Sequence, residues 1–295
     1  MPELDGELWR DITYASHDDL KLYVRHYPAP DERFRSVICL PGLTRNGRDF
    51  TTLATYLAKH PERPRNVYCI DYRGRGRSQY DPNWRNYAPF IELLDVLDFL
   101  TLRGLHHVGI VGTSRGGIIA MLMAALRPTA MGPVVLNDIG PVIETRGLAR
   151  IQDYVGRMPV PKTWPDAVTI MRELNEHAFT ALTDEQWEEI AKDVFDEQKG
   201  RPARAYDRKL ARAIGRIDLS RPLPDMWPQF IALGQMPAFV FRGANSDLLS
   251  ADTLETMIDR HPNLRSMTVP DQGHAPLLKE PEILEMIGAF FAAND

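Results

Sequence analysis

The sequence predicts an α/β protein, with a doubly wound, mainly parallel sheet of eight strands, helices on both faces and an inserted helical cap. Two observations carry this prediction. Short, continuously apolar runs alternate with helical stretches, a pattern typical of parallel strands buried on both faces. Residues 143–222 interrupt this alternation, because they hold helix signals but no strand candidate.

The eight strands can be assigned in chain order. Residues 8–27 predict two strands around a turn at Asp18-Asp19, and the second strand runs from Leu20 to Tyr27. The six further strands are the apolar runs SVICLPG (36–42), NVYCIDY (66–72), HVGIVGTS (107–114), GPVVLND (132–138), PAFVFRG (237–243) and LRSMTVP (264–270).

Four helices are expected to accompany these strands. They run from about Arg48 to Lys59, from Pro89 onward, from Ser114 to about Leu126, and from Pro281 onward. The apolar residues of the second helix recur at i, i+3, i+4 and i+7, which places them on one face: Leu93, Val96, Leu97 and Leu100.

Residues 143–222 predict a helical cap between two sheet strands. Thr163 with Asp166, and Thr183 with Gln186, have the spacing of a helix-capping box. We therefore expect residues 1–142 and 223–295 to form the core and residues 143–222 to form a lid. The alternative is that these helices thicken the fold and take no part in binding. We expect most large apolar and aromatic side chains of this segment to form the core of the lid and a few to face the pocket. The candidates are Tyr154, Met158, Trp164, Met171, Phe179, Trp187 and Tyr206.

The composition indicates a globular protein of the cytoplasm. Hydrophobic residues make up 44% of the chain, and the net charge of −5 argues against nucleic acid as a partner. The start of the chain, MPELDGELWRD, has no apolar segment of a secretory signal, and no apolar run is long enough to span a membrane. Cys39 and Cys69 lie in apolar runs and are expected to be buried free thiols.

The segment GTSRGG, residues 112–117, directly follows an apolar strand. A serine at a sharp strand-to-helix turn needs small neighbours two positions on either side, and Gly112 and Gly116 occupy these positions. The pattern predicts that Ser114 is a nucleophile at the start of a helix. The alternative is a glycine-rich loop in which Ser114 only caps the helix.

A serine nucleophile requires a base and an acid that orients the base. His274, in the loop DQGHAPLL before the last helix, is the candidate base, and the other seven histidines are left unassigned. Asp247 follows the strand PAFVF and Asp138 ends the strand VVLND, so both are candidate acids. Both would lie at the carboxyl edge of the sheet, where sites form.

Five segments together resemble the α/β-hydrolase fold superfamily. They are LPGLTRNGRDF (40–50), DYRGRGRS (71–78), GTSRG (112–116), RGANSDLLS (242–250) and GHAP (273–276), and the resemblance covers nearly the whole chain. The resemblance implies the α/β-hydrolase fold and the chain order serine, acid, histidine.

The resemblance also implies roles for individual residues. Ser114 would be the nucleophile, His274 the general base and Asp247 the orienting acid, because the segment around Asp247 matches the commoner pattern. Asp138 is the alternative acid, since some members carry the acid after that earlier strand. The backbone N–H groups of Leu43 and Arg115 would form the oxyanion hole.

The implied activity is hydrolysis of a small-molecule carboxylic ester, amide, lactone or thioester, without a cofactor. The apolar and aromatic side chains of the lid further favour a substrate with an apolar or aromatic acyl portion. One alternative is carbon–carbon hydrolysis of dienoate ring-cleavage products, which some serine relatives perform. A second alternative is a non-catalytic ligand receptor on the same fold. No metal-ligand spacing is present in the sequence, so we expect no metal.

Two arginine-containing features have structural explanations. The tract RGRGR, residues 73–77, is a single short copy in an acidic chain, so a turn is favoured over an RNA-binding tract. Arg115, in the first turn of the nucleophile's helix, is expected to pair with a buried protein acid in preference to a substrate carboxylate.

Overall fold

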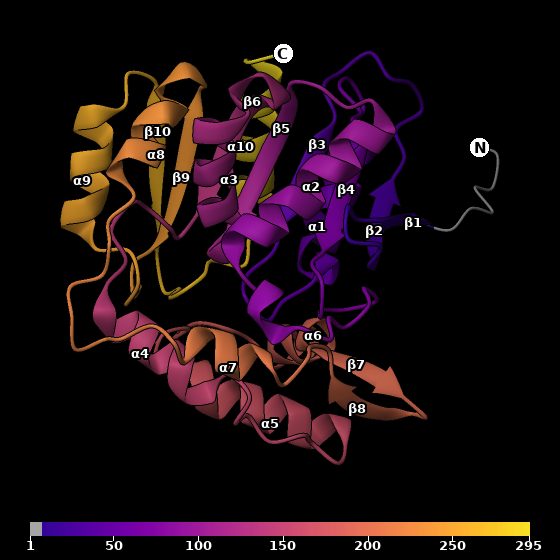
Figure 1. The fold of residues 1–295 in the computed structure, drawn as a ribbon, viewed down its shortest axis with the longest axis vertical. Helices are drawn as coiled ribbons and strands as arrows, with labels where there is room; N and C mark the ends of the chain where they lie inside the picture. Colours follow the sequence, from indigo (N-terminus) through magenta and orange to yellow (C-terminus); the bar gives the residue numbers. More distant parts are fainter. Residues whose placement is uncertain (1–7) are drawn as a thin grey trace.

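An eight-stranded sheet runs through the computed structural model of the protein, which describes residues 8–295 (Figure 1). The strand order is β1-β2-β4-β3-β5-β6-β9-β10. β2 is antiparallel to both of its neighbours, and all other pairs are parallel, which confirms the predicted α/β fold. The bounds are β1 (Arg10–Ala15), β2 (Lys21–Tyr27), β3 (Val37–Leu40), β4 (Val67–Asp71), β5 (Val108–Thr113), β6 (Met131–Asn137), β9 (Ala238–Gly243) and β10 (Leu264–Val269).

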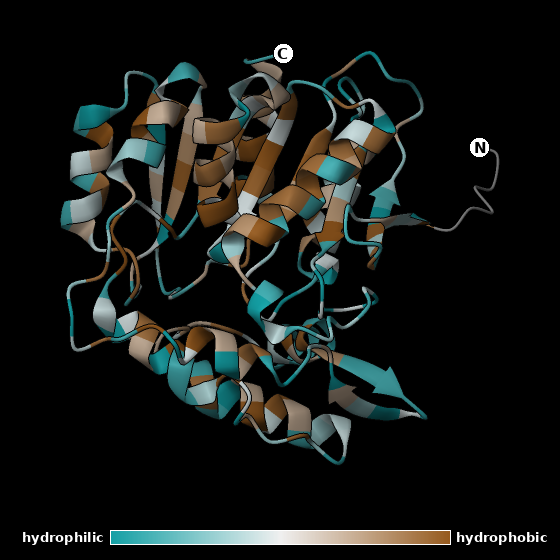
Figure 2. Ribbon diagram, in the orientation of Figure 1, coloured by the Kyte–Doolittle hydropathy of each residue, from teal (hydrophilic) through white to brown (hydrophobic). Residues whose placement is uncertain are grey.

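Helices cover both faces of the sheet because the strand residues are apolar on both sides. Residues such as Ile38, Ile110 and Leu136 pack toward α2, α3, α8 and α9, and their neighbours in the chain pack toward α1 and α10. Figure 2 shows the hydrophobic colouring concentrated on β5 and α3. The helix bounds are α1 (Thr51–Ala58), α2 (Pro89–Arg103), α3 (Arg115–Leu126), α8 (Trp227–Ala232), α9 (Ala251–Arg260) and α10 (Pro281–Ala292).

Between β6 and α8 the chain forms a layer beyond the carboxyl ends of the parallel strands (Figure 1). Its helices are α4 (Thr145–Tyr154), α5 (Trp164–Asn175), α6 (Asp184–Val194) and α7 (Leu210–Ile214). Both predicted capping boxes are present: Thr163 with Asp166 at the start of α5, and Thr183 with Gln186 at the start of α6. The boundaries of this segment as a separate unit stay a prediction.

The expectation that this segment has no strand is wrong. β7 (Phe195–Gln198) and β8 (Arg201–Arg204) form a two-stranded antiparallel hairpin. Lys199 and Gly200 form its two-residue turn, and both have positive φ angles, 53° and 74°, as a tight hairpin turn requires. Most of the eight strand residues are polar, and Figure 2 shows β7 as hydrophilic, so no apolar alternation marked the strands in the sequence.

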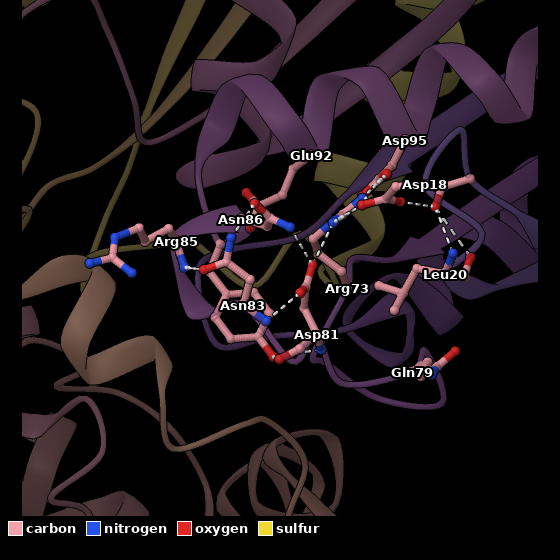
Figure 3. Close-up of polar contacts among 12 residues, drawn as sticks. Asp18, Leu20, Arg73, Gln79, Asp81, Asn83, Arg85, Asn86, Glu92 and Asp95 are labelled. Carbon is pink, nitrogen blue, oxygen red and sulfur yellow. Dashed lines mark hydrogen bonds and ion pairs between the residues drawn. The ribbon is translucent and has the colours of Figure 1, made fainter.

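The tract RGRGR forms the predicted turn after β4. Gly74 and Gly76 have φ angles of 74° and 52°, which suit glycine. The Arg73 guanidinium is fully buried and binds three carboxylates: Asp18 at 2.9 Å, Asp81 at 2.6 Å and Asp95 at 2.6 Å (Figure 3). This ion cluster joins the β1–β2 turn, the segment after β4 and α2.

Potential metal-ligand atoms of His17, Asp18 and Asp95 lie within 4.8 Å of one another in this cluster. Asp18 and Asp95 already bind Arg73, so a cation would have to compete with the guanidinium for their oxygens. The cluster is therefore explained by the burial of Arg73.

Other sequence predictions can be compared with residues 8–295. Cys39 and Cys69 are free and buried, as predicted, and are register partners on β3 and β4. Within the described residues, no helix combines the length and the apolar character needed to cross a membrane. Residues 1–7, on which part of the expectation about a secretory signal rests, lie outside the described residues.

Candidate active site

Ser114 lies at a sharp turn between β5 and α3. Its backbone has φ 51° and ψ −109°, an unfavourable conformation for a residue with a side chain. A Cβ atom on Gly116 would lie 2.0 Å from the Leu40 carbonyl oxygen, and one on Gly112 would lie 2.7 Å from the Gly116 backbone. Both glycines are therefore explained by the close approach of α3 to β3 and β5. The Ser114 hydroxyl makes no capping hydrogen bond, so helix capping does not explain this serine.

His274 and Asp138 complete a continuous chain of hydrogen bonds with Ser114. The Ser114 Oγ lies 2.8 Å from His274 Nε2, and His274 Nδ1 lies 2.8 Å from Asp138 Oδ2. A carboxylate only accepts, so Nδ1–H donates to Asp138 and Nε2 is free to accept the Ser114 proton. Asp138 is fully buried, and its carboxylate also accepts from the Gly243 N–H at 2.8 Å and the Ser246 hydroxyl at 2.5 Å.

The preference for Asp247 as the partner of His274 is wrong in this structure. Both Asp247 oxygens bind the Arg150 guanidinium of α4, at 2.6 Å and 2.8 Å. Burial alone would raise the pKa of Asp247, but the hydrogen bond and charge of Arg150 hold it below its ordinary value.

Sheet order explains why the alternative acid contacts His274. β6 lies directly beside β5, which Ser114 immediately follows, whereas β9 is one strand further away. Asp138 immediately follows β6, and its carboxylate is held by hydrogen bonds from Gly243, the last residue of β9, and from Ser246 in the loop after it.

The two backbone N–H groups predicted for the oxyanion hole belong to the loop after β3 and to the start of α3. Leu43 lies in the loop after β3, which borders the same cavity as Ser114, and Arg115 is the first residue of α3. Within residues 8–295, neither N–H donates a hydrogen bond to another protein atom. Such groups at a helix start and a loop can stabilise a developing negative charge.

A buried ion cluster lies beneath this loop and α3. The Arg75 guanidinium donates to the Leu43 carbonyl at 2.8 Å and lies 2.7 Å from the Glu92 carboxylate. Arg115 lies 3.5 Å from the other Glu92 oxygen, so its predicted pairing with a buried acid is confirmed. The hydrogen bond from Arg75 thereby holds the backbone carbonyl of Leu43 in place.

A cavity of about 480 Å³ opens above Ser114 and His274. Apolar side chains from α4, α5 and α6 form much of its wall. Five of the seven lid residues singled out in the sequence line it: Tyr154, Met158, Met171, Phe179 and Trp187. Trp164 and Tyr206 do not line it: Tyr206 is buried in the hydrophobic core, and Trp164 is partly buried against that core.

The cavity wall also carries ion pairs that the sequence did not reveal. Arg45 binds Asp49 at 2.6 Å, and Lys279 binds Asp193 at 2.8 Å. Each arginine or lysine that lines the cavity within residues 8–295 contacts a carboxylate. Lys279 and Asp193 lie 86 residues apart in the chain, so no local pattern could have predicted that pair, whereas Arg45 and Asp49 have the i, i+4 spacing of a local ion pair.

Comparisons with known proteins agree with this fold. The model of the alpha/beta hydrolase family matches residues 37–285. The 3-hydroxybutyrate-oligomer hydrolase of Cupriavidus necator is 31% identical over 270 residues, which cover 87% of this chain and 88% of that protein. The sn-1-specific diacylglycerol lipase ABHD11 of Mus musculus is 25% identical, over 89% of this chain and 82% of that protein. The crystal structure of an alpha/beta hydrolase from Novosphingobium aromaticivorans superposes with a TM-score of 0.90 at 38% identity, and covers 97% of this chain and 99% of that one.

Proposed function

The chain belongs to the alpha/beta hydrolase family, and from this premise we propose that it is a serine hydrolase of small-molecule carboxylic esters. Ser114 is the nucleophile, His274 the general base and Asp138 the orienting acid. The single observation that carries the proposal is the unbroken chain of hydrogen bonds from the Ser114 hydroxyl through His274 to Asp138, with both steps at 2.8 Å.

The reaction follows from the roles that these groups can take. His274 Nε2 accepts the Ser114 proton while Oγ attacks the ester carbonyl carbon. The backbone N–H groups of Leu43 and Arg115 stabilise the oxyanion, each contributing roughly 10²–10³ in rate. Asp138 stays ionised and stabilises the imidazolium.

The intermediate collapses when His274 protonates the leaving alcohol, which leaves an acyl group on Ser114. A water molecule then gives its proton to His274 and attacks the acyl carbon. The second tetrahedral intermediate expels Ser114, which recovers its proton from His274, and the carboxylic acid is released.

The cavity supports a substrate with an apolar acyl portion. Met171, Phe179 and Trp187 offer apolar contacts, and the cations of the wall are already paired with carboxylates. We infer that residues 143–222 act as a lid over this substrate. The similarity to a 3-hydroxybutyrate-oligomer hydrolase and to a diacylglycerol lipase favours an ester bond as the target.

Hydrolysis of p-nitrophenyl acetate and butyrate tests the proposal. We expect turnover by the wild type and none above background by Ser114→Ala. Asp138→Asn should lower kcat by about 10⁴-fold, by analogy with other serine triads. Asp247→Asn is the matched control, with the same chemical change one loop away, and should retain kcat within a few-fold.

Three outcomes would contradict the proposal. Wild-type protein without turnover of any ester would favour carbon–carbon hydrolysis or a ligand receptor. Unchanged turnover by folded Ser114→Ala would remove Ser114 as the nucleophile. An inactive Asp247→Asn beside an active Asp138→Asn would reverse the assignment of the acid.

A further inference from the structure

Asn137 is the last residue of β6 and directly precedes Asp138. Its side chain is only 1% exposed, and neither the family pattern nor the proposed reaction assigns it a role. We infer that Asn137 is a positioning residue, which holds the loop of His274 at the right distance from Ser114. This inference rests on the proposed function, because it concerns the alignment of the same three residues.

Asn137 contacts all three segments that carry the proposed triad. Its side-chain Nδ2 donates to the Pro276 carbonyl at 2.8 Å, two residues after His274. The same Nδ2 donates to Thr113 Oγ1 at 3.1 Å, and the Asn137 main-chain oxygen accepts from the Ser114 N–H at 3.0 Å. The third segment is its own, since Asp138 is its neighbour in the chain.

The orientation of the Asn137 amide follows from hydrogen-bond chemistry. A carbonyl oxygen only accepts, so the group facing Pro276 must be the NH₂ group. The Oδ1 atom consequently has no partner among the described residues. A buried amide with one unpaired atom lowers the stability of the fold by itself. Stability therefore does not explain this side chain, whereas a role in positioning the His274 loop does.

Among the described residues, further hydrogen bonds tie the residues around His274 to other elements, but none of them holds Pro276. His274 Nδ1–H donates to Asp138, and the Asn245 N–H donates to the Gln272 carbonyl at 2.9 Å. Pro276 has no N–H and therefore cannot bond to the sheet as a donor. The Leu277 N–H donates to Gln272 Oε1 at 2.8 Å, but Gln272 belongs to the same loop. The Asn137 amide thus anchors the loop to β6, which carries the proposed acid.

The substitution Asn137→Ala tests this anchor. A displacement near 1 Å at a catalytic group lowers rates by about 10²-fold, so we expect kcat to fall 10- to 100-fold while KM changes less than about three-fold. Asn66→Ala is the matched control, because Asn66 is another buried asparagine, bonded to His26 and Ala29 far from the cavity. That control should keep the wild-type kcat.

A comparison of leaving groups separates misalignment from simple loss of folded protein. An alkyl alcohol leaves only when His274 protonates it, whereas p-nitrophenolate leaves readily as an anion. With a displaced His274, Asn137→Ala should lose at least five-fold more kcat on an alkyl butyrate than on p-nitrophenyl butyrate. A smaller amount of folded enzyme would lower both rates by the same factor.

Two further measurements keep the inference falsifiable. Asn137→Leu retains the side-chain volume without the donor, and should show the same leaving-group ratio if the alanine variant does not fold. A crystal structure of either variant should show the backbone of residues 274–276 displaced relative to the wild type, and this readout needs no substrate.

Wild-type kcat in Asn137→Ala, equal losses on both esters, or an undisplaced loop would each overturn the inference. Failure of the proposed function is distinguished by the wild type itself. An enzyme that hydrolyses no ester and is not labelled at Ser114 by a fluorophosphonate contradicts that function, while the displacement of the loop is still decided by the crystal structure.

Discussion

Replacing Gly116 with alanine should disable the site without unfolding the protein. The added Cβ would lie 2.0 Å from the Leu40 carbonyl oxygen and 2.6 Å from its carbonyl carbon, whereas ordinary contacts of a Cβ begin near 3.4 Å. The gap between α3 and β3 must therefore widen by 3.4 − 2.0 = 1.4 Å. The atoms of Leu40 at this contact belong to its backbone, so no side-chain rotation can relieve the overlap.

This displacement would act directly on the proposed oxyanion hole. Leu40 ends β3, and the chain continues from it to Leu43, whereas α3 carries Ser114 and Arg115. Moving β3 away from α3 separates the two proposed N–H donors. We expect kcat for p-nitrophenyl butyrate to fall by about 10²-fold, and overpacking to lower the free energy of unfolding by about 1–3 kcal/mol.

Gly104→Ala provides the control for this experiment. Gly104 ends α2 at φ 63°, and nothing lies within 4 Å of a Cβ built there. Alanine should lower the free energy of unfolding by about 1 kcal/mol through backbone strain and leave kcat unchanged. A Gly116→Ala enzyme that is folded and turns over at the wild-type rate would refute the steric argument for the turn at Ser114.

Further predictions concern stability and substrate choice. Burial raises the pKa of Asp71 to about 6 against the opposing hydrogen bonds from Gly47 and Arg77, so the folded state binds a proton that the unfolded state releases near pH 4. The free energy of unfolding should therefore fall by up to about 3 kcal/mol between pH 4 and pH 7 on account of this group, and urea titrations of Asp71→Asn should lack that part of the slope. Arg73→Met should lower the free energy of unfolding by about 3–5 kcal/mol, because it leaves buried carboxylates unpaired; a loss below 1 kcal/mol by urea titration would contradict this. Trp187→Ala enlarges the cavity and should shift the ratio of kcat/KM values for p-nitrophenyl octanoate and acetate toward octanoate by at least three-fold, and an unchanged ratio would remove Trp187 from the acyl site.

The elements that could be predicted from the sequence are those with local causes. The apolar runs of the sheet and the two capping boxes are set by residues within a few positions of each other, and each appears in the structure. The β7–β8 hairpin was missed because its strands are short and polar. Its signal was limited to Lys199-Gly200, a turn compatible with many loops.

The partner of His274 could not be decided locally. Asp138 and Asp247 both follow strands at the same edge of the sheet, and the chain order of motifs is the same for either acid. The choice depends on strand order and on Arg150, which approaches Asp247 from α4. The positioning role inferred for Asn137 could likewise not be predicted from the sequence, because its partner Pro276 is 139 residues away.

The residues of the proposed triad are far apart in the sequence, and this separation has a consequence for the order in which they become available during synthesis. His274 leaves the ribosome 160 residues after its partner Ser114, and the Gly243 N–H that holds Asp138 follows that acid by 105 residues. Domains form native contacts as their segments become available, and contacts of long sequence separation form slowly. A nascent chain that has already folded β3, β5 and α3 therefore carries a serine without a base. If the proposed triad is correct, hydrolysis requires residue 274 to be synthesised and β9 and β10 to have joined the sheet, so chains truncated before residue 274 should be catalytically silent.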